Sequence, residues 1–198
     1  MSIFTEEEKN HINKTRGTHS SRGILDTLIA IEKLFGKKER IKVEKAIKEE
    51  EYNILEMQKK INIPINSFIA FLILEKKILH LNEEEMRKVA RETAKLSFLL
   101  KFVSRFFVSL DMLAKNANNA WKKYYNCGEL KIIDINKKEK RAVAEVRNFW
   151  GHPTHCRYLE GYLEEIVFFV LGRKTKCREA NCPFKNDGDV HRFLITWE

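Results

Sequence analysis

The spacing of hydrophobic residues changes once along this chain of 198 residues, at about residue 127. Before that point, apolar residues recur at intervals of three and four, which is the period of helices lying on a core. After it, short β-type runs alternate with polar turns, which is typical of strands. The order predicts an α+β fold, with a helical N-terminal half packed on a C-terminal antiparallel sheet.

Residues 1–126 are expected to form the helical part. Ser20 or Ser21 is positioned to cap a first helix that Gly36 ends, and a second helix is expected over about 38–48. The dipeptide Ile63-Pro64 interrupts the helices, because proline disfavours the α conformation in the residue before it.

Three further helices are expected before the change in spacing. One restarts at Asn66-Ser67, and another follows Asn82, which forms a capping-box pattern with Glu85. The run from Leu96 to Leu113 is apolar over most of its circumference, so it predicts a helix buried on several sides.

Residues 127–198 predict a ββαββ unit that forms one compact domain with the helices. Strands are expected at 129–135, 141–149, about 174–179 and 190–197, with a helix from Pro153 to Gly172 between the second and third.

Composition and charge narrow the class of protein. The net charge of +9 could indicate a nucleic-acid partner, but lysine and glutamate are interleaved along the chain, which favours a solvated surface without nucleic acid. Neither a signal peptide nor an apolar stretch long enough to span a membrane is present, so we expect a cytoplasmic protein. Four cysteines are too few for a disulfide scaffold and fit a reducing compartment.

Metal-ligand residues are concentrated in the tail. Cys156 is expected in the first turn of the helix, Glu179 and Cys182 at the end of one strand, and His191 at the start of the next. These ends can meet at one edge of a ββαββ unit. Zinc takes about four such thiolate, imidazole and carboxylate ligands.

Two alternatives stay open within this set. His152 lies four residues before Cys156 and competes with His191, and Cys177 competes with Glu179. The spacing includes no CxxC pair, so the residues are also compatible with cysteines that act as small buried hydrophobes.

Four segments of the tail carry a family resemblance: Cys156-Arg-Tyr-Leu-Glu-Gly-Tyr162, Leu171-Gly-Arg173, Arg178-Glu-Ala-Asn-Cys182 and Gly188-Asp-Val-His-Arg-Phe193. They resemble the 4-vinyl reductase or hydrocarbon-binding domain family, which includes the sensor domains of phenol- and xylene-responsive transcription activators. In those sensors two of the cysteines and an acidic residue that match Cys156, Cys182 and Glu179 bind a structural zinc with a third cysteine. His191 stands near the place of that third cysteine, and imidazole is an equally good zinc ligand.

The whole chain also resembles the haem nitric-oxide/oxygen-binding (H-NOX) fold, through Ala30-Ile-Glu-Lys-Leu-Phe-Gly36, Ile63-Pro64, Leu110-Asp-Met-Leu-Ala114 and the closing Asp189–Trp197. That superfamily includes vesicle-tethering subunits (TRAPP) that bind an acyl chain and partner proteins.

The resemblance to the haem-binding members does not extend to their haem ligands. Ala114 occupies the place of the proximal histidine, and the Tyr-x-Ser-x-Arg anchor would fall at Asn148, Trp150 and His152. We therefore expect no haem in the usual mode.

The fold of these relatives implies a ligand cavity between the helical half and the sheet. Candidate wall residues, each of which could equally be plain core, are Phe102, Phe106, Phe107, Trp121, Tyr125, Phe149 and Trp150, with His152 as a polar group.

These observations favour a zinc-containing sensor or carrier for an apolar or aromatic molecule. The first alternative is a homodimeric interaction module that pairs through its N-terminal helices. The second is an enzyme, but the sequence has no Gly-x-Gly-x-x-Gly, Gly-x-Ser-x-Gly or HExxH motif. A zinc site with four protein ligands is closed, which is typical of a structural metal.

Overall fold

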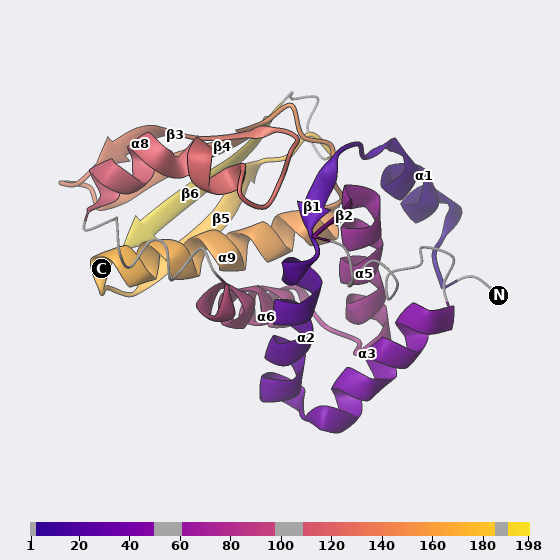
Figure 1. Ribbon diagram of the computed structural model, residues 1–198. Helices are drawn as coiled ribbons and strands as arrows, with labels where there is room; N and C mark the ends of the chain where they lie inside the picture. The colour runs from indigo at the N-terminus through magenta and orange to yellow at the C-terminus, as the bar shows by residue number, and fades with distance from the viewer. Residues whose placement is uncertain (1–2, 50–60, 98–108, 185–189) are drawn as a thin grey trace.

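The computed structural model describes residues 3–49, 61–97, 109–184 and 190–198 (Figure 1). Its helices are α1 Glu6–Lys14, α2 Arg22–Phe35, α3 Lys37–Glu49, α5 Ile65–Ile78, α6 Glu83–Leu96, α8 Leu110–Trp121 and α9 Pro153–Leu171. Its strands are β1 Thr18–Ser20, β2 Asn62–Pro64, β3 Glu129–Asn136, β4 Arg141–Arg147, β5 Thr175–Asn181 and β6 Val190–Trp197. The predicted α+β fold class, with a helical front half and a ββαββ tail, is confirmed.

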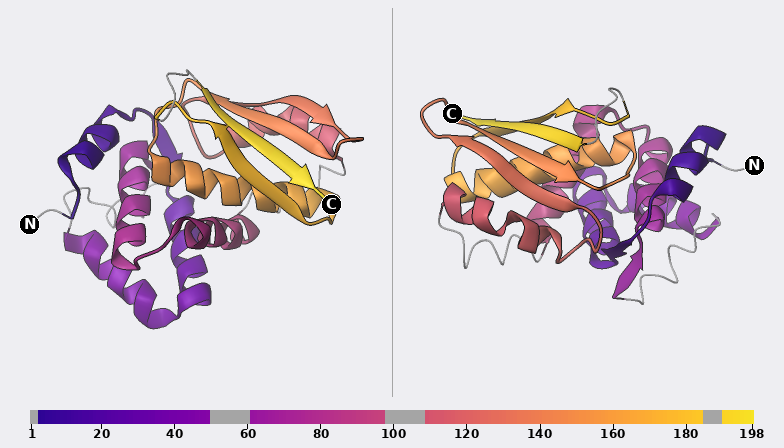
Figure 2. Two further views of the ribbon diagram at one scale, coloured as in Figure 1. Left: turned by 180° about the vertical axis from the view of Figure 1, so that it is seen from behind. Right: turned by 90° about the horizontal axis from the view of Figure 1, so that it is seen from above.

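The C-terminal strands form one antiparallel sheet in the order β3-β4-β6-β5. Alternate residues of β6, from His191 to Trp197, are buried, as expected of a strand with one face on a core. Helix α9 runs along that face of the sheet (Figure 2). Pro153 occupies its first position, and Gly172 ends it in the left-handed conformation.

Local sequence explains most boundaries of the helical half. Gly36 ends α2 with a φ of 94°, a conformation that favours glycine. Asn82 and Glu85 form the predicted capping box at the start of α6. Ser21 occupies the N-cap position of α2, but its side chain makes no capping hydrogen bond.

Two features of this half differ from the sequence-based expectation or go beyond it. Helix α6 ends at Leu96 and α8 begins at Leu110, so most of the core helix expected from Leu96 to Leu113 lies outside the described residues. Strands β1 and β2 pair in a small antiparallel sheet that places His19 opposite Ile63. Three-residue strands are too short to leave an alternating pattern.

Helices α6 and α9 approach each other closely at Gly161. A Cβ atom there would lie 2.2 Å from the carbonyl oxygen of Arg87, so only glycine allows this crossing. One residue earlier, the carboxylate of Glu160 accepts a hydrogen bond from Nε of Arg87 at 2.6 Å. The crossing therefore fixes where α9 lies relative to the helical half.

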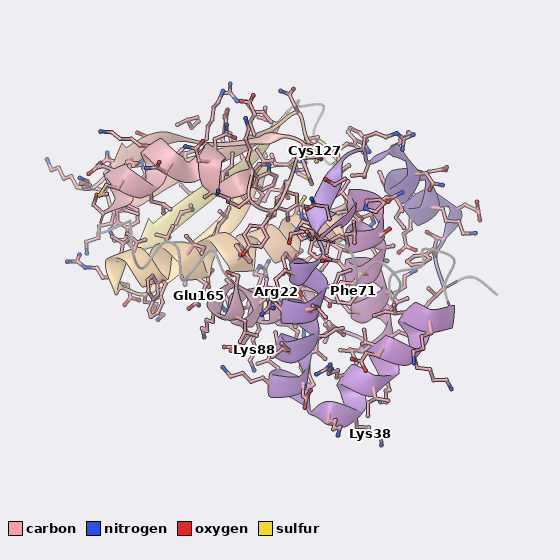
Figure 3. All side chains as sticks on the ribbon, viewed as in Figure 1. Arg22, Lys38, Phe71, Lys88, Cys127 and Glu165 are labelled. Atoms are coloured by element: carbon pink, nitrogen blue, oxygen red, sulfur yellow. The ribbon has the colours of Figure 1, made fainter. Side chains whose placement is uncertain are left out.

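The hydrophobic core continues from the helices into the sheet. Phe71 on α5, Tyr158 on α9 and Phe193 on β6 belong to the same cluster of buried side chains. In Figure 3, Phe71 lies inside the helical half, whereas Lys38 and Lys88 extend from its surface.

Candidate metal centre and apolar cavity

Three elements of the tail bring four ligand-type side chains together. Cys156 is in the first turn of α9, Glu179 is in β5, Cys182 follows the end of that strand, and His191 is in β6. The pairing of β5 with β6 shifts register between Glu179 and Asn181. Such a bulge bends the strand locally, and here Cys182 lies beside Glu179 rather than farther along the sheet.

The four side chains are close enough to share one ion. One ligand atom from each lies within 4.8 Å of those of the other three. Nδ1 of His191 is 2.9 Å from Oε1 of Glu179 and 3.4 Å from Sγ of Cys156. Ligand atoms around tetrahedral zinc are roughly 3.3–3.8 Å apart, given bond lengths of about 2.0–2.3 Å. The cluster therefore has the composition and nearly the spacing of such a site.

Burial and mutual contacts set the charge state of the cluster. Cys156, Cys182 and His191 are buried, and the side chain of Glu179 is 1% exposed. A hydrogen bond with Cys156 lowers the pKa of Cys182 to about 7, and the same contact raises the pKa of Cys156 well above its ordinary value. Burial raises the pKa of Glu179, but hydrogen bonds to His191 and Cys156 outweigh it and lower the pKa overall. Cys182 and Glu179 therefore lose their protons before Cys156 does, and their negative charge favours the binding of a cation.

On the side away from the cluster, Glu179 begins a row of alternating acidic and basic side chains that continues through Arg157 and Glu160 to Arg87. Nη2 of Arg157 donates to Oε2 of Glu179 at 2.6 Å, and Nη1 of Arg157 donates to Oε1 of Glu160 at 2.7 Å. Glu160 also pairs with Arg87 of α6. Oε1 of Glu179 is left facing the cluster. Sequence reasoning missed this row, and only the helical spacing of Arg157 and Glu160 could have indicated part of it.

Neither alternative ligand joins the cluster. His152 is the N-cap of α9, with φ −145° and ψ 151°, so it does not share a helical face with Cys156. Its Nδ1 accepts a hydrogen bond from the backbone N–H of Thr154 at 3.1 Å, and burial lowers its pKa to about 4. Cys177 is fully buried two residues before Glu179, within the hydrophobic core.

Replacing His152 by alanine is expected to remove a helix cap and leave the cluster of Cys156, Glu179, Cys182 and His191 unchanged. Loss of an N-cap hydrogen bond costs about 1 kcal/mol, which lowers the melting temperature of a chain this long by about 2–4 °C. Calorimetry and elemental analysis of the purified His152→Ala variant check both parts. A loss of bound zinc in this variant would show that His152 is a ligand.

An apolar cavity of about 80 Å³ lies between the sheet and helices α6, α8 and α9. Helix α8 contributes Leu113, Ala117 and Trp121 to its wall, and α9 contributes Leu159, Tyr162 and Ile166. Because α9 also carries Cys156, one helix connects the cavity to the metal-ligand cluster.

Two of the expected wall residues line this cavity. The rings of Trp121 and Tyr125 stack with their centroids 4.0 Å apart and both face it. Phe102, Phe106 and Phe107 lie outside the described residues.

Three other expected wall residues do not line it. Phe149 is buried but does not line the cavity; its ring is nearly perpendicular to those of Trp121 and Tyr125, with centroids 5.6 and 5.8 Å away. Trp150 is 42% exposed. His152 lies at a separate surface hollow, since the strand-to-helix junction faces outward there.

Most polar groups of the cavity wall have partners. The hydroxyl of Tyr158 is 3.2 Å from Oγ1 of Thr27, and that of Tyr125 is 3.1 Å from Nε2 of His155. His19 was not predicted as a wall residue, because β1 was not predicted. Its ring is stacked on Phe68 with centroids 3.9 Å apart.

The protein is expected to lose stability as the pH falls below 6.5, in part through His19. Burial lowers the pKa of His19 from 6.5 to about 3, so the unfolded chain takes up this proton first. The resulting loss is about 1.4 kcal/mol per pH unit, or about 2 kcal/mol at pH 5. Thermal melts of the protein and of His19→Gln between pH 5 and pH 7 measure it. Equal pH dependence in both would contradict the assignment.

Neither a membrane-spanning helix, in the part of the chain that the structure describes, nor a similar curated sequence is found. No helix among residues 3–49, 61–97, 109–184 and 190–198 is long and apolar enough to cross a membrane. The sequence matches no protein-family model and no curated protein.

Solved structures, in contrast, match nearly the whole chain. An Fe(II) unliganded H-NOX protein mutant from K. algicida aligns with a TM-score of 0.62 at 12% identity, covering 90% of this chain and 96% of that one. An H-NOX protein from S. oneidensis in the Fe(II)NO ligation state aligns with a TM-score of 0.59 at 11% identity, covering 89% and 98%. A Cs H-NOX mutant gives 0.60 at 12% identity, covering 90% and 96%. The chain therefore has the fold of H-NOX domains.

Proposed function

We propose that this protein is a zinc-containing sensor or carrier domain that binds a small apolar or aromatic molecule. The observation that carries the proposal is the convergence of Cys156, Glu179, Cys182 and His191 within 4.8 Å. Two thiolates with an imidazole and a carboxylate suit zinc better than magnesium or calcium. Four protein ligands leave no open position for a substrate, so the metal would stabilise the fold rather than catalyse a reaction.

Charge balance supports a divalent ion. Arg157 and Arg87 neutralise Glu179 and Glu160 in the buried row behind the cluster. When zinc replaces the thiol protons of Cys156 and Cys182, two positive charges enter and two leave. The buried region is thus neutral when zinc is bound, which avoids the large cost of an uncompensated charge.

The arrangement also supports a relationship to the 4-vinyl reductase or hydrocarbon-binding family. The three positions that match its zinc ligands, Cys156, Glu179 and Cys182, are the ones that lie together. Gly161, part of the Gly-Tyr pattern of that family, is required for the close crossing of α6 and α9.

The cavity residues do not fit haem. Helix α8 contains no histidine, and the only imidazole among the described wall residues, His19, is stacked on Phe68. No lysine or arginine of the described chain lines the cavity, so haem propionates would meet no cation among the described wall residues. Its volume, about 80 Å³, is below the roughly 300 Å³ at which pockets for drug-sized ligands begin.

A compact probe can test ligand binding. Benzene is expected to bind saturably, because a dry apolar cavity of roughly 150 Å³ admits it and the space here, about 80 Å³, is of the same order. Ala117→Leu should abolish binding by filling the cavity, whereas Ala180→Leu on an exposed position of β5 should not. Titration followed by NMR of cavity residues measures both. Unsaturable binding, or equal binding to the two variants, would contradict the proposal.

Dimerisation through the N-terminal helices stays a prediction. Ile29 on α2 and Ile41 on α3 are exposed, at 41% and 52%. Light scattering on the purified chain tests it, and a strict monomer would exclude it.

A further inference from the structure

The described cavity wall contains polar atoms that lack a hydrogen-bond partner, among them Nδ1 of His19 and the hydroxyl oxygen of Tyr162. Tyr162 of α9 lines the cavity, and its buried hydroxyl makes no hydrogen bond of good geometry. Burial raises the pKa of Tyr162, and the nearby Ser97 hydroxyl opposes that rise only in part. Ser97 also lines this region, but its own hydroxyl donates to the carbonyl oxygen of Ala94 at 2.7 Å. A buried hydroxyl left without an acceptor costs about 1–3 kcal/mol.

The neighbouring tyrosines show that this is specific to one position. Tyr158 lies one helical turn earlier on α9 and is paired with Thr27, and Tyr125 is paired with His155. The cavity therefore presents a single tyrosine hydroxyl of α9 that is available to an occupant.

The charge of the wall restricts that occupant further. Burial keeps His19 neutral by lowering its pKa to about 3. Asp26, the only carboxylate among the described wall residues, forms an ion pair with Arg22 at 2.9 Å. An anion would find no positive partner in the described wall, and burying it there would be costly.

We propose that the ligand is uncharged and carries one hydrogen-bond acceptor, such as a carbonyl, ether or ring nitrogen, to which the Tyr162 hydroxyl donates. This inference rests on the proposed ligand-binding function and adds the chemical class of the ligand. It distinguishes such a ligand from a pure hydrocarbon.

Benzene and pyridine form a matched pair of probes, since they share shape and differ by one acceptor. Dissociation constants are measured at about pH 8, where pyridine is uncharged, for the full-length protein and for Tyr162→Phe. The substitution should weaken pyridine binding about 5- to 100-fold and change benzene binding less than about 3-fold. Because the hydroxyl makes no hydrogen bond of good geometry in the free protein, Tyr162→Phe should fold with an unchanged or higher melting temperature.

Tyr158→Phe is the control. It removes a hydroxyl that is already paired with Thr27, so it should lower stability and affect both probes equally. Equal effects of Tyr162→Phe on benzene and pyridine would overturn the inference while leaving the ligand-binding function in place. Failure of both probes to bind the unmodified protein would overturn that function and the inference with it.

Discussion

Cys182→Ser should lose its zinc and melt about 8–16 °C lower than the unmodified protein. The serine hydroxyl does not ionise near neutral pH, so the site keeps three ligands and the buried charge balance is broken. An ion whose free concentration is about 1,000 times its dissociation constant raises the free energy of unfolding by about 4 kcal/mol. For a chain of this length, each kcal/mol corresponds to about 2–4 °C. Calorimetry with elemental analysis of the same sample measures both effects.

Cys127→Ser provides the matched control. Cys127 is a free, half-buried thiol outside the cluster, at the end of the sheet near β1 (Figure 3). It should retain one zinc ion per chain and melt within a few degrees of the unmodified protein. If Cys127→Ser and Cys182→Ser behave alike, the stabilisation does not come from the four-residue cluster.

Gly161→Ala should be among the most destabilising single substitutions in the chain. The new Cβ would lie 2.2 Å from the carbonyl oxygen of Arg87 and 2.8 Å from its Cα, and both are backbone atoms that cannot rotate away. Helices α6 and α9 must move apart, which strains the buried Arg87–Glu160 pair as well as the core. Overpacking of this kind costs about 3 kcal/mol, or about 6–12 °C in melting temperature.

Gly172→Ala separates this effect from the general cost of replacing glycine. Gly172 ends the same helix, and a Cβ there would meet nothing within 4 Å. Its cost is limited to the left-handed backbone, about 1–2 kcal/mol. Chemical denaturation of both variants gives the comparison. A Gly161→Ala protein as stable as Gly172→Ala would show that the helices do not cross as closely as described.

Local patterns were sufficient to predict most of the fold. The Asn82–Glu85 capping box, Gly36 and the alternation from His191 to Trp197 each act within a few residues of sequence, and each lies where expected. The short β1–β2 pair was missed because its partners are far apart in sequence and its strands are too short to show a period.

The candidate site was harder to predict, because three-dimensional contacts decide which of the candidate ligand residues lie together. Cys177 and Glu179 lie on the same strand two residues apart, and the sequence alone could not separate them. Their distance from Cys156 and the bulge that follows Glu179 separate them in space. The Arg157–Glu160 support was not visible either, since burial of both charges depends on the packing of α6 against α9.

X-ray absorption spectroscopy at the zinc edge of the freshly purified 198-residue chain would identify the ligands of a bound zinc ion. We expect one zinc ion per chain with two sulfur ligands at about 2.3 Å and two nitrogen or oxygen ligands at about 2.0–2.1 Å. Protein without zinc, or zinc with a first shell that contains no sulfur, would contradict this expectation.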